Sequence, residues 1–169
     1  RFVVDMGAPG LDKGKGGKYL ILPPDYEGDL DPPVGGEFAE VDGEEYIVAK
    51  SPTYVNWLVL RGFLVDGKPD AANAMFKNGL KIYPLKDKKN PPKMKFISGS
   101  EIPFNTIHAN NFHFYEELNH IIQREPFSLI DLELRGLIAS IGIQKGKPFK
   151  PDARTKDLLT KAVAVGNGT

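Results

Sequence analysis

The hydrophobic pattern of this chain changes from strand-like to helix-like near residue 96. Before that point, short apolar runs alternate with clusters of glycine, proline and aspartate, which is typical of strands joined by turns. After it, apolar residues recur at helical spacing behind N-cap residues. Strands followed by helices indicate an α+β fold or a β-sandwich with a helical appendage. We therefore divide the chain into a β-rich part, residues 1–96, and a helical segment, residues 97–169.

A hairpin is the strongest strand signal in the first part. Asp42-Gly43 separates two apolar runs, and both residues tolerate the positive φ angles of a tight turn. Residues 54–65 are almost continuously apolar, so we expect a strand buried on both faces with Trp57 in the core. A short helix is predicted near 69–79. The predicted strands cover residues 2–5, 18–22, 37–41, 45–49, 54–65 and 80–85.

Three helices are predicted in the second part. Each follows an asparagine or aspartate that can cap its first turn, and two are followed by a glycine that can end them. The segments 51–53 and 145–148 are predicted turns. The predicted helices run from Asn110 or Asn111 to about Arg124, from Asp131 to Ile141 before Gly142, and from Asp152 to about Val165 before Gly166.

The composition is that of one ordinary globular domain, with 41% hydrophobic and 26% charged residues. The absence of cysteine excludes disulfides, thiolate catalysis and cysteine-ligated zinc. No apolar run approaches the roughly 18 residues of a membrane span. The chain opens on Arg1-Phe2 and not on methionine, so we expect a mature or truncated product. A net charge of zero gives no global attraction to nucleic acid or anionic membranes, so partners must be sought locally.

The charges are nevertheless segregated along the chain. Residues 25–45 hold nine acidic residues and no basic one, whereas residues 77–95 hold seven lysines and one aspartate. Two interpretations are open: complementary docking between subunits or halves, or two solvated loop regions. The lysine-rich stretch contains no arginine for phosphate recognition and no regular aromatic spacing for base stacking, so we expect no nucleic-acid partner.

The glycine- and lysine-rich segment 7–18 looks like a phosphate-binding loop, but its spacing does not match one. Gly17-Lys18 is followed by Tyr19 where a P-loop needs serine or threonine, and a strand follows where a helix is required. We therefore predict a run of turns whose glycines allow close approach to a subunit or ligand. The predicted ligand-binding residues are Lys13, Lys15, Lys18 and Arg61.

All three histidines lie between residues 108 and 120. His113, Glu117 and His120 share one helical stripe, and Glu-x-x-His is a unit of carboxylate-bridged metal bundles. The opposite face is apolar, however, which turns this stripe toward water. We therefore expect no cofactor and keep a metal site through these three residues as a weaker alternative.

His108 lies in a non-periodic segment just before that helix. With Asn105 and Asn110 it forms the candidate catalytic set of a hydrolase, in which His108 is the acid or base. The other interpretation is a histidine that satisfies the loop backbone and the start of the helix. No nucleophile is adjacent, so both interpretations stay open.

Several separated motifs carry a resemblance to a known family. They are the segment from Gly7 to Pro24, Ser51-Pro52-Thr53 with Trp57 and Arg61, Asn105 to Asn110, Gly146 to Phe149, and Pro151 to Arg154. In this order they resemble the later part of domain-of-unknown-function family 1254 (DUF1254). Longer members continue into a second domain, family 1214 (DUF1214). His108 lies within a recurrent motif, whereas positions 113 and 120 need not be histidine in the family pattern.

The resemblance implies architecture more than chemistry. Members resemble paired jelly-roll-like β-sandwiches with helices, assemble as oligomers, and are often exported, which favours a periplasmic or secreted location. The expected function is a non-catalytic oligomeric β-sandwich module that binds a partner or a glycan-like ligand, with homo-oligomers or a complementing domain as partners. A hydrolase that uses His108 is the alternative.

Overall fold

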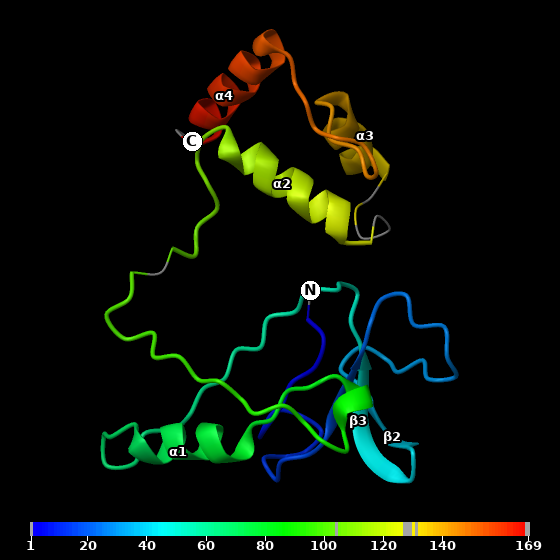
Figure 1. Ribbon diagram of the computed structural model, residues 1–169, viewed down its shortest axis with the longest axis vertical. Coiled ribbons are helices and arrows are strands. Elements are labelled where there is room, and N and C mark those ends of the chain that lie inside the picture. Colours follow the sequence, from blue (N-terminus) through cyan, green and yellow to red (C-terminus); the bar gives the residue numbers. More distant parts are fainter. Residues whose placement is uncertain (1, 104, 127–129, 131, 168–169) are drawn as a thin grey trace. The chain divides into compact units, whose positions relative to one another are not determined.

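The computed structural model describes residues 2–103, 105–126, 130 and 132–167 (Figure 1). The chain divides into two compact units, one of residues 1–56 and 106–169 and the other of residues 57–105. The described residues form a mixed α/β fold with a three-stranded sheet, four α-helices and one 3-10 helix. None of the described helices is both long enough and apolar enough to span a bilayer.

The sheet contains strands β1 (Tyr19–Leu22), β2 (Glu37–Val41) and β3 (Glu44–Lys50) in the order β1-β3-β2. β3 pairs in parallel with β1 and antiparallel with β2. The β2–β3 connection confirms the predicted hairpin, because Asp42 and Gly43 have φ angles of 52° and 73°. The three strands predicted in this region are therefore confirmed.

The core of the sheet is centred on β3. Its residues from Tyr46 to Ala49 are all buried, because a central strand is covered by neighbours on both sides. Tyr46 and Val48 point to one face, where they form a cluster with Leu22. Ile47 points to the other face and lies against the glycine-rich loop: a Cβ added at Gly17 would be 3.6 Å from its Cδ1.

Three other predicted strands are wrong. Residues 2–5, 54–65 and 80–85 join no sheet among the described residues, and the last of these leads into the 3-10 helix η1 (Leu85–Asp87). The side chain of Trp57, predicted to be buried, is 78% exposed. Residues 54–65 avoid helix, but a buried strand also requires neighbours that cover its side chains. Those neighbours are not supplied by the described residues.

The second unit contains helix α1 (Asp70–Gly79), which confirms the helix predicted near 69–79. α1 has no fully buried residue. Its closest neighbour is the segment at Gly62, where an added Cβ would lie only 2.4 Å from the Cβ of Ala72. The absence of a side chain at Gly62 therefore allows the segment to pass against the helix.

The other three helices are α2 (His113–Arg124), α3 (Leu132–Ser140) and α4 (Ala153–Asn167). Ile122 of α2, Ile138 of α3 and Ile143 after α3 form one buried cluster. Tyr115, Leu118, Ile130, Ile141 and Phe149 pack around it. The three helices predicted here are thus confirmed, and α2 and α3 share one small buried cluster.

The ends of these helices follow the predicted capping in most places. Asn111 Oδ1 accepts the N–H of His113 at 2.9 Å, and Asp152 Oδ1 accepts the N–H of Thr155 at 2.7 Å. Gly142 has a φ of 90° just after α3, as predicted for a helix stop. The predicted cap at Asp131 lies outside the described residues. The predicted stop at Gly166 is wrong, since α4 continues to Asn167.

Candidate functional site

The glycine-rich loop is organised around one buried carboxylate, that of Asp12. Its side chain is only 8% exposed. Oδ1 accepts the N–H of Gly7 and the hydroxyl of Tyr19, both at 2.7 Å, and Oδ2 accepts the N–H of Gly16 at 3.0 Å. The Tyr19 hydrogen bond, followed by the backbone bonds, lowers the pKa of Asp12. Burial, followed by the hydrogen bond to Asp12, raises the pKa of Tyr19 to about 12.

This arrangement explains why the loop is not a phosphate cradle. A phosphate site needs backbone N–H groups that converge on an external anion. Here two such groups already converge on the chain's own carboxylate. The role of Asp12 was not predicted, although it is the only acidic residue between Gly7 and Lys18. Its isolation among glycines and lysines was the available signal.

The predicted ligand-binding residues are exposed, but they do not form one group. Lys13 and Lys15 extend from the loop, whereas Lys18 Nζ forms an ion pair with Glu44 Oε2 at 3.0 Å. Arg61 belongs to the other compact unit. A ligand-binding role for these four residues therefore remains a prediction.

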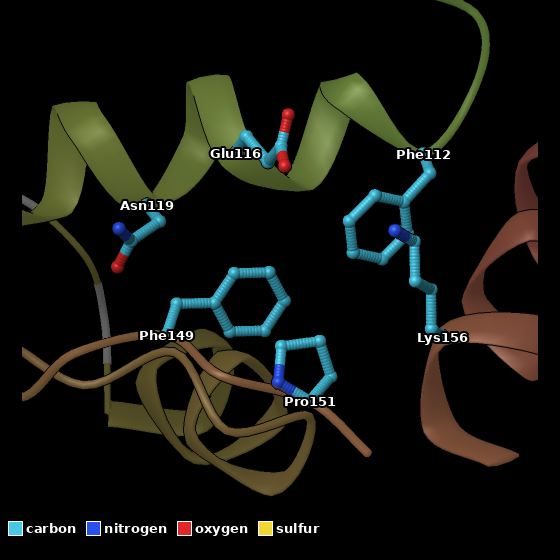
Figure 2. A pocket seen from close by; sticks show the side chains of 6 residues that line it. All are labelled: Phe112, Glu116, Asn119, Phe149, Pro151 and Lys156. Carbon is cyan, nitrogen blue, oxygen red and sulfur yellow. The ribbon is translucent and has the colours of Figure 1, made fainter. Parts of the chain in front are cut away.

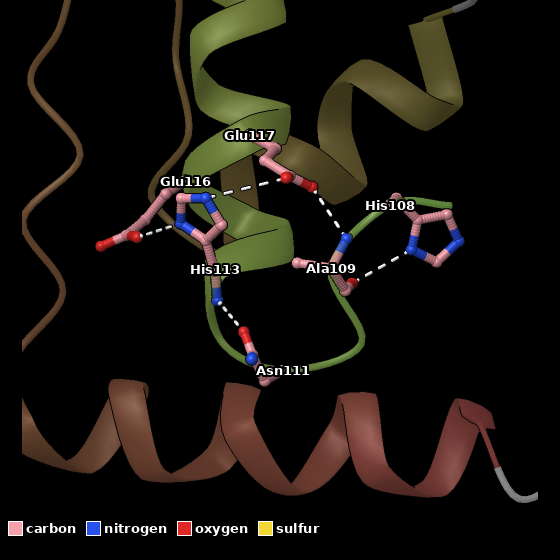
Figure 3. A network of polar contacts seen from close by, with 6 residues as sticks. All are labelled: His108, Ala109, Asn111, His113, Glu116 and Glu117. Carbon is pink, nitrogen blue, oxygen red and sulfur yellow. Dashed lines mark hydrogen bonds and ion pairs between the residues drawn. The ribbon is translucent and has the colours of Figure 1, made fainter. Parts of the chain in front are cut away.

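His108 makes contacts that are typical of a structural loop residue. Its Nδ1 lies 3.0 Å from the Ala109 carbonyl oxygen, and its ring meets Phe114 edge-on at a centroid distance of 5.2 Å. Ala109 in turn donates its N–H to Glu117 Oε2 at 3.0 Å, so the loop is tied to α2 (Figure 3). Asn110 lies in the same unit as His108, whereas Asn105 lies in the other unit. The catalytic set remains a prediction.

The stripe of histidines and glutamates on α2 is engaged in pairs. His113 Nδ1 lies 2.7 Å from Glu116 Oε2, while His113 Nε2 lies 3.7 Å from Glu117 Oε1 (Figure 3). The hydrogen bond to Glu116 raises the pKa of His113. His120 Nε2 lies 3.2 Å from Arg124 Nη1, whose positive charge disfavours a cation there. In the described part of the chain, no three side chains of metal-binding type are grouped around a common point.

A hollow of about 220 Å³ lies between α2, the segment before α4, and α4 itself. Glu116 and Asn119 reach it from α2, Phe149 and Pro151 line the opposite side, and Lys156 extends from α4 (Figure 2). The rings of Phe112 and Phe149 are stacked, with centroids 6.1 Å apart and planes inclined by 14°. Lys156 Nζ lies 4.8 Å from the centroid of the Phe112 ring.

None of the residues predicted as site residues lines this hollow. It brings together α2 and residues about 40 positions later, and sequence periodicity does not report such contacts. The available signal was the motif that ends in Phe149, followed closely by Pro151.

Two side chains hold the wall of the hollow that contains Phe149. Gln123 on α2 donates from Nε2 to the Gln144 carbonyl at 2.8 Å and accepts the N–H of Gly146 at its Oε1, also at 2.8 Å. Lys145 Nζ donates to the carbonyl oxygens that end α2, including that of Glu125 at 2.5 Å. The turn at 144–147 is thereby fixed to α2, and it leads directly into Phe149.

Glu125, which directly follows α2, also binds the segment after β3. The Glu125 carboxylate accepts the N–H groups of Tyr54 and Val55, at 2.8 and 3.1 Å. The bend before them contains Ser51, which is 1% exposed and whose Oγ donates to the Thr53 carbonyl at 2.8 Å. This confirms the turn predicted at 51–53 and gives its hydroxyl a structural role.

Comparison with known proteins yields a match to one family model. No curated protein matches the chain. A family model matches residues 2–84, a range that covers the Asp12 loop, the three-stranded sheet and α1. The resemblance predicted from the sequence motifs is therefore confirmed over this range. The model that matches residues 2–84, just under half of the chain, is described as "Protein of unknown function (DUF1254)".

Proposed function

We propose that this chain is a non-catalytic interaction module that assembles with a second copy of itself through residues 57–65, here called the apolar segment. The observation that carries the proposal is the exposure of its hydrophobic side chains. Phe63 is 92% exposed and Trp57 78%, and Val59 and Leu64 are also exposed. A contiguous apolar surface of this kind marks an interaction site in proteins that fold normally.

The backbone of the apolar segment supports pairing with another strand. It forms no helix, and among the described residues its strand pairing is limited to an isolated bridge between Val65 and Lys68. An extended segment with an open edge is a template for strand addition. The sheet offers two edges for this, because among the described strands β1 and β2 each pair with β3 alone. Strands added there would extend the sheet toward the sandwich that the family resemblance implies.

The charge distribution supports a second copy as the partner. The nine acidic residues of 25–45 belong to one unit and the seven lysines of 77–95 to the other. Almost all of these side chains are exposed. Two copies arranged head to tail place the acidic segment of one against the lysine-rich segment of the other, and such complementarity favours correct encounter. The association should therefore weaken as salt is raised.

Light scattering coupled to size exclusion tests this proposal. We expect a mass of at least twice the 18.6 kDa of one chain at low salt, and a smaller mass at high salt. The double variant Trp57→Ser/Phe63→Ser should be monomeric. Val165→Ser is the matched control, because Val165 is 70% exposed but lies on α4, outside the apolar segment and both charged segments. A monomer at high concentration, or equal effects of the two variants, would contradict the proposal.

A further inference from the structure

We infer that the hollow between α2 and α4 binds one uncharged pyranose ring, of the kind found in glycans. Its lining combines two aromatic rings and a proline with one carboxylate, one amide and one ammonium group (Figure 2). Apolar walls with a few placed polar groups are the usual composition of small-molecule sites. The volume, about 220 Å³, is below the roughly 300 Å³ at which sites for drug-sized ligands begin, so it suits a single small ring.

The charges in the hollow disfavour a charged ligand. Glu116 and Lys156 carry opposite charges and both line the space, so an anion meets the carboxylate and a cation meets the ammonium. A ligand cation would also lack an aromatic face at Phe112, because Lys156 Nζ already lies 4.8 Å from that ring centroid. The hollow therefore favours a neutral molecule with both donors and acceptors.

The spacing of the aromatic rings disfavours a flat aromatic ligand between them. Insertion of a ring needs about 7 Å between the two faces, twice the contact distance of about 3.5 Å between carbon atoms. The centroids of Phe112 and Phe149 are only 6.1 Å apart. A ligand must instead lie across the outer surface of the pair, with an apolar face on Phe149 and Pro151.

A pyranose meets these requirements because it has an apolar ring face and peripheral hydroxyl groups that both donate and accept. Glu116 lines the hollow and holds His113 through Oε2, so we assign its Oε1 as the acceptor for a ligand. Asn119 Oδ1 accepts from Gln123 Nε2 at 3.0 Å, so the amide nitrogen of Asn119 is the group offered to a sugar oxygen. Lys156 supplies a second donor on the opposite side.

Nuclear magnetic resonance titration of the full chain tests this inference. The probes are glucose, galactose and N-acetylglucosamine, with glucosamine as the cationic and glucuronate as the anionic analogue. We expect saturable shifts of the amides at 112–119 and 149–156 for at least one neutral sugar, with a Kd on the order of 1 mM, as is typical for a ligand of so few atoms. The charged analogues should bind at least about fivefold more weakly.

Two variants in the hollow and one control variant outside it test which residues bind the sugar. Glu116→Gln and Lys156→Gln should each weaken binding about tenfold or more, which corresponds to one hydrogen bond to a charged group. Lys161→Gln, on the same helix as Lys156 but outside the hollow, should leave the Kd unchanged. The amide spectrum of each variant reports whether it is folded. The inference is wrong if no neutral sugar gives saturable shifts, if a charged analogue binds as tightly, or if Lys161→Gln weakens binding as much as the two hollow variants.

Discussion

β3 and the apolar segment are both apolar runs, but only β3 forms a strand and is buried. The side chains from Tyr46 to Ala49 are at most 6% exposed, whereas Trp57 and Phe63 are largely exposed. The difference lies in their neighbours: β3 has β1 on one side and β2 on the other. The comparison shows that an apolar run favours a strand by its composition, but that its pairing and burial depend on strands elsewhere in the chain or in another copy.

The largest change in stability is expected from a charge placed in β3, and the same change in the apolar segment should have almost no effect on stability. Val48 is 0% exposed, so Val48→Asp buries an unpaired carboxylate and should destabilise the fold by about 4 kcal/mol or more. Val59→Asp should change the stability of the monomer by less than about 0.5 kcal/mol, because Val59 is 69% exposed. Urea unfolding followed by circular dichroism measures both.

Val59→Asp should act on assembly and not on folding. Folded Val59→Asp should be monomeric by light scattering, since it places a charge in the proposed interface. If Val59→Asp unfolds the monomer as Val48→Asp does, the two runs do not differ in burial and the comparison fails.

The second effect concerns the loop that covers the sheet at Ile47. In Asp12→Asn, one of the acceptor oxygens becomes an amide that faces a donor, and the charge is lost. We expect a destabilisation of about 3 kcal/mol, because hydrogen bonds to a charged group contribute more than neutral ones. Asp5→Asn is the control, since Asp5 lies in the preceding segment and is exposed. Equal stability of the two variants in urea would show that the Asp12 network does not hold the loop.

This carboxylate also predicts the acid sensitivity of the fold. The pKa of Asp12 is lower in the folded chain than its ordinary value of 3.8, so the unfolded chain binds the proton more tightly. The stabilisation is therefore complete above about pH 3.8 and is lost as the pH falls through the lowered pKa. Between these values the wild-type chain should lose more stability than Asp12→Asn. Parallel acid titrations of the two chains would contradict this.

The third prediction concerns the contact between Gly62 of the apolar segment and Ala72 of α1. Gly62→Ala places a Cβ within 2.4 Å of the Ala72 Cβ, so α1 must move, and we expect a cost of about 2 kcal/mol in the unit of residues 57–105. Gly79→Ala is the matched control, because an added Cβ there meets no atom within 4 Å. Amide hydrogen exchange of α1 measures both. If the α1 amides of Gly62→Ala are as protected from exchange as those of the wild type, Gly62 does not pack against Ala72 in solution.

The smallest expected effect is on the pKa of His113, on the surface of α2. Glu116→Gln should lower the pKa of His113, because the hydrogen bond to Glu116 is the main cause of its raised value. A titration of the imidazole proton shifts measures this change, and Asp157→Asn on α4 serves as a remote control. An unchanged His113 pKa in Glu116→Gln would show that the pair does not form in solution.

The sequence predicts the local structure of this chain better than its long-range contacts. The hairpin at Asp42-Gly43 and the caps at Asn111 and Asp152 depend on φ angles and hydrogen bonds within a few residues, and these were predicted. The exposure of Trp57 was not, because it depends on which strands are available as partners.

The candidate sites, like the exposure of Trp57, depend on long-range contacts that the sequence does not predict. The hollow joins Phe112 to Phe149, which are far apart in the sequence, so no spacing rule reports it. The role of Asp12 depends on how the loop closes on Tyr19, and residue types alone do not specify that closure. His108 was recognised as unusual from its local motif, but its contact with Phe114 was visible only in the fold.

The fluorescence of Trp57 tests the central claim most directly, because it is the only tryptophan in the chain and lies in the apolar segment. If a second copy covers this segment, the emission at high protein concentration should be that of a buried indole. On serial dilution or at high salt it should shift to the red and become accessible to acrylamide, in step with the loss of mass by light scattering. Emission that is independent of concentration would contradict assembly through the apolar segment.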